Sequence, residues 1–213
     1  MAETVSFASN GDTASGYLAV PDSGSGPGLL VVQEWWGLVP QIKRCCDRLA
    51  AEGFVALAPD LYRGDYAEHT EMDKANELMQ SLPPDRAARD MAGAIGFCMG
   101  GMLTLMIAAL QGDRIGAATP FYGAPLGDMA PDWSTLSAPV QGHFAENDDF
   151  FRPEAVKELE RQLRDMGKDV EFIVYPGTGH AFGNEENALG THDEQAAATA
   201  WDRATKFLKT KLS

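Results

Sequence analysis

The chain has 213 residues, 45% of them hydrophobic and 9% aromatic, and its 17 basic and 31 acidic residues give it a formal net charge of −14. This apolar content excludes a disordered chain, and the acidic excess argues against nucleic acid or an anionic membrane as the main partner. No apolar run approaches the ~20 residues of a membrane-spanning helix, and the amino end does not look like a signal peptide, so we expect a cytoplasmic protein with one domain over residues 1–213.

The first half of the chain predicts strands interrupted by one helix. We expect strands at residues 4–7, 16–20, 29–32 and 54–58 and a helix over 40–52. The dipeptide Asn10-Gly11 favours a hairpin turn between the first two strands. The continuous apolar run at 29–32 is typical of a strand that is buried on both faces of a sheet. Pro40 suits the first turn of the helix, and Gly53 ends it.

The second half continues the alternation of strands and helices. We expect strands at 94–97, 117–121, 140–144 and 170–175, and helices over 102–110, over 153–166 and from Asp193 or Glu194 onward, the last with Trp201, Thr205 and Leu208 along one side. Because such alternation is built from right-handed crossovers, it predicts an α/β fold with a mostly parallel central sheet and helices on both faces. Sites in these sheets lie beyond the carboxyl ends of the strands.

The residues after the strand at 94–97 form a nucleophile-elbow pattern. Gly96, Gly100 and Gly101 surround Cys98 with positions that lack bulk, as the tight turn between strand and helix requires. The turn would aim the Cys98 sulfur into the crevice, where backbone N–H groups can hold an oxyanion and the helix dipole favours a thiolate. The alternative is a buried cysteine that acts as a small hydrophobic residue, which leaves the glycines unexplained.

The other two cysteines, Cys45 and Cys46, are neighbours on the packing face of the predicted helix. Adjacent cysteines make a strained disulfide at best, which excludes a disulfide framework. The sequence contains no pair of Cys-x-x-Cys clusters for zinc. We therefore expect neither a metal nor another cofactor.

A thiol nucleophile needs a base, and the base needs an acid that orients it. His180 follows a strand into a glycine loop, where an accessible imidazole is expected, whereas His143 lies inside a predicted strand. A hydrogen bond within the loop is the alternative role of His180. Glu146, Asp148 and Asp149 all follow the strand at 140–144, as candidate acids or as a solvated acidic turn. The chain order of nucleophile, acid and histidine is the order expected of α/β-hydrolases.

Six stretches, spread nearly from end to end of the chain, carry specific motifs. They are 33–37 (QEWWG), 59–62 (PDLY), 96–101 (GFCMGG), 120–123 (PFYG), 142–148 (GHFAEND) and 175–182 (YPGTGHAF). Together they resemble the motifs of the dienelactone hydrolase (carboxymethylenebutenolidase) family. The resemblance implies an α/β-hydrolase fold and a catalytic triad of Cys98, Asp148 and His180. It selects Asp148 over Asp149, a choice that the residues alone leave open.

The same resemblance implies roles for further residues. The backbone N–H groups of Trp35 and Met99 would be the oxyanion donors. Glu34 would contact the resting thiol and help to convert it to a thiolate when substrate binds. Apart from the resemblance, the residues themselves offer aromatic side chains that would line the substrate pocket or, alternatively, pack in the core: Trp35, Trp36, Tyr122 and Phe182.

The chain departs from the family where a substrate carboxylate would be held. Family members that cleave dienelactone use two arginines, and one of them lies four residues after the triad histidine, where this chain has Asn184. The other would fall within 71–75, which contains no arginine. Because an amide cannot replace a guanidinium in carboxylate binding, a less charged ester or lactone is as well supported as dienelactone.

A second departure lies just before the nucleophile. Family members enter this strand through a long helix, whereas here residues 83–93 run almost at once into the strand at 94–97. A helix over 85–92 would be about 12 Å long, shorter than the ~17–20 Å of a full strand. We therefore expect either a shortened central strand, with 71–81 supplying part of the crossover, or an unstable protein.

The sequence thus predicts a cysteine-dependent hydrolase of carboxylic esters or lactones that forms a thioester acyl-enzyme. Its partner is expected to be a small-molecule ester or lactone, and the protein itself a monomer or a weak homodimer. Two alternatives stay open. The two departures are compatible with a non-catalytic relative that binds a small molecule. A thiol redox protein that uses Cys98 is the other, although no resolving cysteine is apparent.

Overall fold

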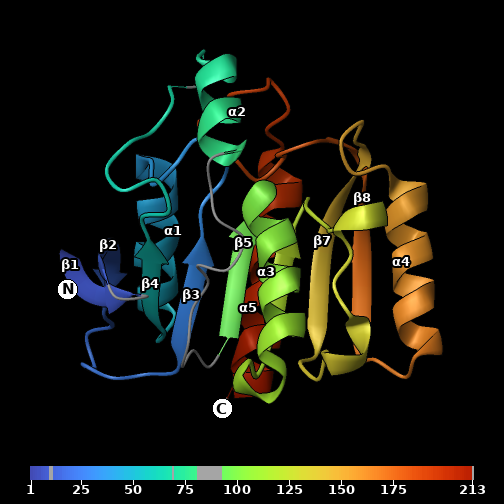
Figure 1. Cartoon of the computed structure of the whole chain (residues 1–213), viewed down its shortest axis with the longest axis horizontal. Coiled ribbons are helices and arrows are strands. Elements are labelled where there is room, and N and C mark those ends of the chain that lie inside the picture. Colours follow the sequence, from blue (N-terminus) through green and yellow to red (C-terminus); the bar gives the residue numbers. More distant parts are fainter. Residues whose placement is uncertain (10–11, 69, 81–92, 213) are drawn as a thin grey trace.

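The computed structural model describes residues 1–9, 12–68, 70–80 and 93–212, and its centre is a twisted sheet (Figure 1). Within these residues the sheet has eight strands in the order β1-β2-β4-β3-β5-β6-β7-β8. The strands are β1 (Ala2–Ser9), β2 (Asp12–Ala19), β3 (Gly28–Val32), β4 (Val55–Pro59), β5 (Gly93–Phe97), β6 (Ala118–Phe121), β7 (Val140–Asn147) and β8 (Val170–Gly179). β1 and β2 run antiparallel to their neighbours and the other pairs are parallel, which confirms the predicted mostly parallel sheet.

Helices cover both faces of the sheet. They are α1 (Pro40–Ala51), α2 (Met72–Gln80), α3 (Met99–Gln111), α4 (Pro153–Asp165) and α5 (Glu194–Leu212). α1 and α5 lie on one face and α3 and α4 on the other, as Figure 1 shows. β3 explains the need for both layers: Leu29 and Val31 pack with the α1 and α5 side chains, whereas Leu30 and Val32 pack with those of α3 and α4. A strand with two buried faces has to be apolar throughout.

The helices follow the apolar pattern of the sequence. In α1, Pro40 occupies the first turn and the side chains of Ile42 and Leu49 are fully buried. Gly53, just beyond the helix, has a φ of 97°, a conformation that glycine adopts without steric cost. In α5 the buried face contains Trp201 and Leu208 as expected, while Thr205 is only partly buried. Within the described ranges, no helix is both long and apolar enough to cross a membrane.

β7 and β8 run further than the sequence pattern predicts. They extend to Asn147 and Gly179, beyond the expected ends at 144 and 175. After an irregularity in register near Ala145, Asn147 pairs with Gly179. The apolar pattern could not reveal this extension, because apart from Ala145 the added residues are polar, glycine or proline. Its effect is to bring the ends of the two strands side by side.

β5 lies in the middle of the sheet and leads to Cys98. Its five residues pair in parallel with β3 on one side and β6 on the other, and all five are buried. The strand is one residue longer than expected and as long as β3 and β4. The helix expected over 85–92 and the turn at Asn10-Gly11 lie outside the described residues. The short crossover and its effect on stability therefore stay predictions.

Candidate active site

Cys98 stands at the sharp turn between β5 and α3. Its backbone has φ 55° and ψ −119°, which is a strained conformation for a residue with a side chain. The turn is fixed on both sides, because the Cys98 N–H donates to the Phe121 carbonyl at 3.0 Å and the Cys98 carbonyl accepts from the Gly101 N–H at 2.9 Å. A strained strand-to-helix turn of this kind is the backbone of a nucleophile elbow. The buried-hydrophobe alternative does not fit the partial exposure of Cys98.

Glycines allow the backbone segments around this turn to approach each other. A Cβ atom on Gly100 would overlap the carbonyl groups of Val32 and Gln33, at the end of β3. A Cβ atom on Gly123 would overlap the carbonyl oxygen of Cys98 itself. Both would meet backbone atoms, which cannot move aside as a flexible side chain can. The sequence pattern identified Gly100 but gave no role to Gly123, whose neighbour in space is far away in the chain.

We therefore expect the Gly123→Ala variant to lose about 3 kcal/mol or more of unfolding free energy, because the new methyl group would push the Cys98 backbone aside. The matched control is Gly28→Ala in β3, where a Cβ atom would meet nothing within 4 Å. Its effect is expected to stay within ~0.5 kcal/mol. Urea unfolding of both variants and the parent measures the difference. Equal losses in the two variants would contradict this explanation of the turn.

Three side chains from separate segments form a hydrogen-bonded series at the carboxyl end of the sheet. His180 Nε2 lies 3.2 Å from Cys98 Sγ, and His180 Nδ1 lies 2.8 Å from Asp148 Oδ2. Asp148 follows β7 and His180 follows β8, so the pairing of Asn147 with Gly179 makes them neighbours. The other carboxylate oxygen, Asp148 Oδ1, accepts the N–H groups of Phe150 and Phe151, both at 2.9 Å. Asp149, by contrast, is exposed.

The environment of His180 favours the imidazolium form. Burial opposes the charge, but hydrogen bonds with Asp148 and Cys98 outweigh it and raise the pKa of His180 to about 10. The same nitrogen that lies 3.2 Å from the Cys98 sulfur is therefore in a position to accept a proton.

Glu34 is buried beside this series, directly after β3. Its two carboxylate oxygens accept hydrogen bonds from the Tyr122 hydroxyl at 3.4 Å and from Asn184 Nδ2 at 2.9 Å. Burial raises the pKa of Glu34 to about 7, while the charge of His180 and these hydrogen bonds oppose the rise. The thiol of Cys98 contacts His180 rather than Glu34 in this arrangement. The expected contact between Glu34 and the resting thiol stays a prediction.

Because the pKa of Glu34 is higher in the folded protein than its ordinary 4.5, the folded state holds this proton more tightly than the unfolded state does. The stabilisation is complete below pH ~4.5 and is lost as the pH rises through about 7. We expect the Glu34→Gln variant to lack this loss. Over the same pH range, the unfolding free energy of wild type should therefore decrease by up to a few kcal/mol relative to that of the variant. Urea unfolding of both proteins from pH 4 to 8 tests this. Parallel curves would contradict the buried-carboxyl interpretation.

Trp35 and Met99, the expected oxyanion donors, come from the loop after β3 and from the start of α3. Met99 is the first residue of α3, so its N–H has no acceptor within the helix. Trp35 follows Glu34 in the loop after β3, and its carbonyl accepts the Tyr62 hydroxyl at 3.1 Å. The Tyr62 oxygen also lies 3.6 Å from Met99 Sδ. Tyr62 thus links the two expected donor residues, a role that the motif containing it did not reveal.

Core packing, the alternative role of the aromatic residues, describes three of them. Trp36, Tyr122 and Phe182 belong to the buried core under α1 and α5, and Trp35 packs against it. Tyr122 also contacts the site through Glu34 and through the edge of the His180 ring. Trp35 is partly exposed. The sequence reasoning missed Phe150 and Phe151, whose rings contact the His180 imidazole.

The remaining cysteines and His143 lie away from this chemistry. Cys45 and Cys46 are free and buried on α1, as expected, so neither is presented to Cys98 as a resolving thiol. His143 is fully buried, and its Nδ1 lies 2.9 Å from the Tyr175 hydroxyl. Burial lowers the pKa of His143 to about 3, so the ring is neutral. Across the described part of the chain, no cluster of three or more His, Cys, Asp and Glu side chains could hold a metal ion.

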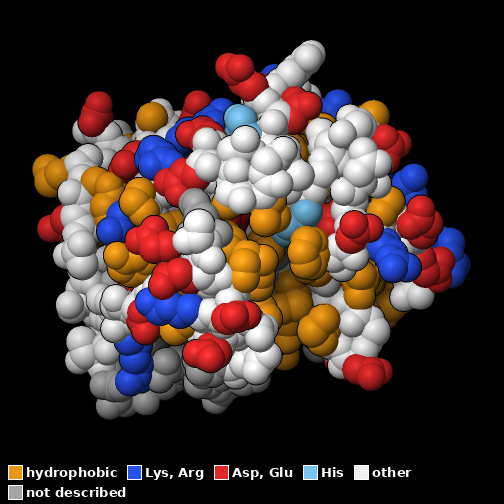
Figure 2. Space-filling view, turned by 90° about the horizontal axis from the view of Figure 1, so that it is seen from above, with side chains coloured by type: hydrophobic (Ala, Val, Ile, Leu, Met, Phe, Trp, Pro, Cys, Tyr) orange, Lys and Arg blue, Asp and Glu red, His pale blue; other side chains and the backbone are white. Residues whose placement is uncertain are grey.

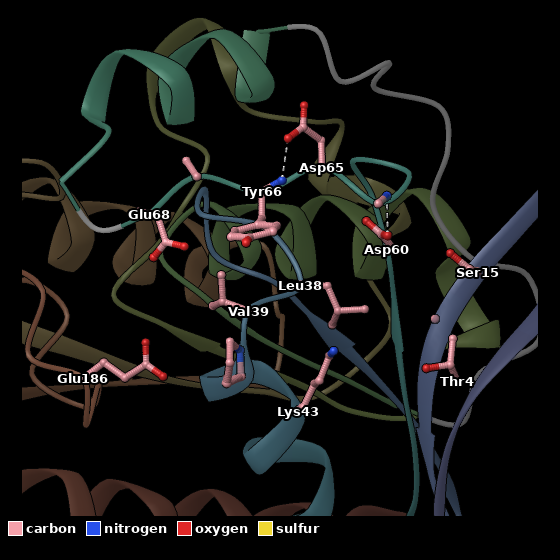
Figure 3. A pocket seen from close by; sticks show the side chains of 14 residues that line it. Thr4, Ser15, Leu38, Val39, Lys43, Asp60, Asp65, Tyr66, Glu68 and Glu186 are labelled. Atoms are coloured by element: carbon pink, nitrogen blue, oxygen red, sulfur yellow. Dashed lines mark hydrogen bonds between the residues drawn. The ribbon is translucent and has the colours of Figure 1, made fainter.

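The face at the carboxyl ends of the parallel strands is shown in Figure 2, where hydrophobic side chains gather around a histidine in the middle of the view. A separate cavity of about 530 Å³ lies between the start of α1, β2 and the loop after β4. In Figure 3, Leu38, Lys43 and Tyr66 are among the side chains around it. Cys98, Asp148 and His180 do not line this cavity. Its size therefore does not mark it as the catalytic site, because the hydrogen-bonded series lies elsewhere.

The family model that matches the chain is the one described as "Dienelactone hydrolase family", over residues 14–92 and 84–212. The two matched segments overlap at 84–92, within the stretch that is not described and where the sequence predicts a short crossover. Together the segments include Cys98, Asp148 and His180.

Similar proteins are known along the whole length of the chain. It is 36% identical to "Protein usf" of Aquifex pyrophilus, and the match covers 100% of both chains. It is 35% identical to a protein of Aquifex aeolicus named "Putative carboxymethylenebutenolidase", again over 100% of both. Among solved structures, a Klebsiella pneumoniae protein titled "Putative Dienelactone Hydrolase" is 28% identical, with a TM-score of 0.85 and 98% of each chain covered.

Proposed function

Because the chain belongs to the dienelactone hydrolase family of ester and lactone hydrolases, we propose that it hydrolyses its substrate through a thioester on Cys98. The observation that supports this most directly is the series from Cys98 through His180 to Asp148, with separations of 3.2 and 2.8 Å. Nucleophile, base and orienting acid occur in the same relation in serine and cysteine hydrolases on unrelated folds.

In the first step, the Cys98 sulfur attacks the carbonyl carbon of the ester or lactone. The thiol proton rests on His180 Nε2, and Asp148 keeps the imidazole oriented by accepting from Nδ1. The carbonyl oxygen becomes an oxyanion held by the N–H groups of Trp35 and Met99, and one such donor contributes roughly 3 kcal/mol in comparable enzymes. When the tetrahedral intermediate collapses, the C–O bond breaks, His180 gives its proton to the leaving alcohol, and the acyl group stays on sulfur.

In the second step, water hydrolyses the thioester. His180 takes a proton from the water, whose oxygen attacks the acyl carbon, and the oxyanion donors act again. The C–S bond then breaks and releases the carboxylic acid. The proton on His180 restores the imidazolium beside the Cys98 thiolate. The chain needs only its own residues for this cycle.

For the substrate, we propose an ester or lactone without a carboxylate bound at position 184. Asn184 is buried, and both ends of its amide are in use: Nδ2 donates to Glu34 and Oδ1 accepts the Glu186 N–H, each at 2.9 Å. One N–H of the amide is left over, and a single neutral donor cannot hold a carboxylate as the charged, two-pronged guanidinium of an arginine does. A panel of small esters and lactones, with and without a carboxylate, tests the point. A clear preference for the carboxylate-bearing members would contradict it.

The deciding experiment is intact-protein mass spectrometry after brief mixing with an activated ester. Wild type is expected to show a transient acyl adduct that maps to Cys98 and disappears as the product accumulates. The binding-only alternative predicts stabilisation by ligand without an adduct or turnover. A wild-type protein that stays unmodified and hydrolyses no member of the panel would overturn the proposal.

A further inference from the structure

The segment after β7 contacts both the acid and the base of the proposed triad. The backbone N–H groups of Phe150 and Phe151 donate to Asp148 Oδ1, and the other oxygen of Asp148 faces His180. The side chains of the same two phenylalanines lie against the His180 ring. Two consecutive residues thus hold the carboxylate with their backbone and contact the imidazole with their rings.

The distances between the rings lie in the range of cation–π contacts. The centroid of Phe150 is 4.8 Å from that of His180 with an interplanar angle of 51°, and the centroid of Phe151 is 5.8 Å away at 25°. A cation within about 6 Å of an aromatic centroid is attracted to the negative face of the ring. Phe150 makes this contact although its side chain is 63% exposed. Phe151, in contrast, also packs against the core under α3 and α4.

The charges that face His180 come from several segments. Cys98 precedes α3 and Asp148 follows β7, and both are hydrogen-bonded to the imidazole. Glu34, after β3, interacts with it electrostatically. Tyr122, after β6, presents a titratable phenol whose ring is 5.4 Å from the imidazole. An additional aromatic ring adds attraction for a positive imidazole without adding a group that titrates.

We propose that Phe150 is a positioning residue, whose ring stabilises the imidazolium form of His180 and thereby favours the thiolate of Cys98. The inference rests on the proposed function, in which His180 is the base. The raised pKa of His180 agrees with it, although Asp148 and Cys98 are the main causes of that rise. Because Phe150 is largely exposed, its ring can be changed without opening the core.

The test is the pH dependence of Cys98 alkylation by iodoacetamide in the full chain. The thiolate reacts, so the midpoint of the profile reports where the thiolate–imidazolium pair forms. Phe150→Leu keeps an apolar side chain but removes the π face, and we expect its midpoint to rise by roughly half a pH unit. Phe150→Trp, with a stronger π face, is expected to keep the wild-type midpoint or lower it. Peptide mass mapping verifies that Cys98, rather than buried Cys45 or Cys46, is alkylated.

Leu110→Ala is the matched control, since Leu110 is also 63% exposed but lies near the far end of α3, about 18 Å along the helix from Cys98. Its midpoint should equal that of wild type. Because Glu34 has a pKa of about 7, the comparison is repeated in a Glu34→Gln background to separate the two titrations. The shift caused by Phe150→Leu should persist there.

An unchanged midpoint in Phe150→Leu overturns the inference, even if ester hydrolysis slows, because a rate loss alone would reflect contact with substrate. A raised midpoint in Phe150→Trp overturns it independently of whether the leucine variant folds. Alkylation needs no ester, so the result is separate from the function itself. A wild-type protein that forms no acyl adduct and hydrolyses no member of the panel would refute the proposed hydrolysis and leave the midpoint comparison valid.

Discussion

We expect the Cys98→Ala variant to lose both the acyl adduct and at least ~10⁴-fold in kcat/KM for ester hydrolysis. Removing the nucleophile of a triad leaves only the contribution of the oxyanion donors and of substrate binding. Fold stability should change little, because Cys98 is partly exposed and alanine retains the backbone contacts of the turn. The measurements are steady-state hydrolysis of the best ester in the panel and intact mass under the same conditions.

Cys46→Ala is the matched control for this variant. Cys46 is fully buried on α1 and is not one of the proposed triad residues, so its loss should lower stability while the acyl adduct still forms. Comparable turnover in Cys98→Ala and wild type would show that another group is the nucleophile. Loss of the adduct in Cys46→Ala, with the protein still folded, would point to the same conclusion.

The second large effect is expected from Asp148→Asn, with a decrease in kcat of about 10³- to 10⁴-fold. Asparagine has nearly the same shape, and its carbonyl oxygen can still accept the N–H groups of Phe150 and Phe151. Its NH₂ group would then face His180 Nδ1, which favours the wrong imidazole tautomer. The imidazolium also loses the carboxylate that raises its pKa, so the loss should be accompanied by a higher midpoint for thiolate formation.

Asp149→Asn changes the same charge one residue further along. Its side chain is exposed, and the carboxylate that meets His180 belongs to Asp148. The variant is expected to keep kcat within about twofold of wild type, because the charge of an exposed side chain is screened by solvent and salt. Equal losses in the two variants would indicate a general charge effect and contradict the assigned orienting role of Asp148.

The sequence was informative wherever a local pattern fixes a local structure. The apolar run at 29–32 and the spacing after Pro40 predicted β3 and α1, because burial on both faces or on one face imposes those periods. The glycines around Cys98 predicted the turn, since no other residue fits there. The motif resemblance selected Asp148, and the structure has that carboxylate on His180.

Contacts between distant loops could not be predicted in the same way. Tyr62 bonds to the Trp35 carbonyl across two loops, and no periodicity encodes that distance. The rings of Phe150 and Phe151 reach His180 only because β7 and β8 extend past their apolar parts. Asn184, noted as a missing arginine, turned out to hold Glu34. Each of these depends on where two chain segments meet, which is a property of the whole fold.

The pairing between the ends of β7 and β8 also indicates which contact of the hydrogen-bonded series is expected to break first. Asp148 and His180 follow two strands that are paired with each other, so we expect the two side chains to move together when the sheet deforms. Cys98 follows β5, which β6 separates from β7, so the 3.2 Å contact between its sulfur and the imidazole joins strands that are not direct neighbours. Partial unfolding by heat or denaturant should therefore first lengthen the distance between the Cys98 sulfur and His180, while the hydrogen bond between Asp148 and His180 persists. We would then expect ester hydrolysis to be lost while the proposed acid and base are still hydrogen-bonded, before the sheet unfolds.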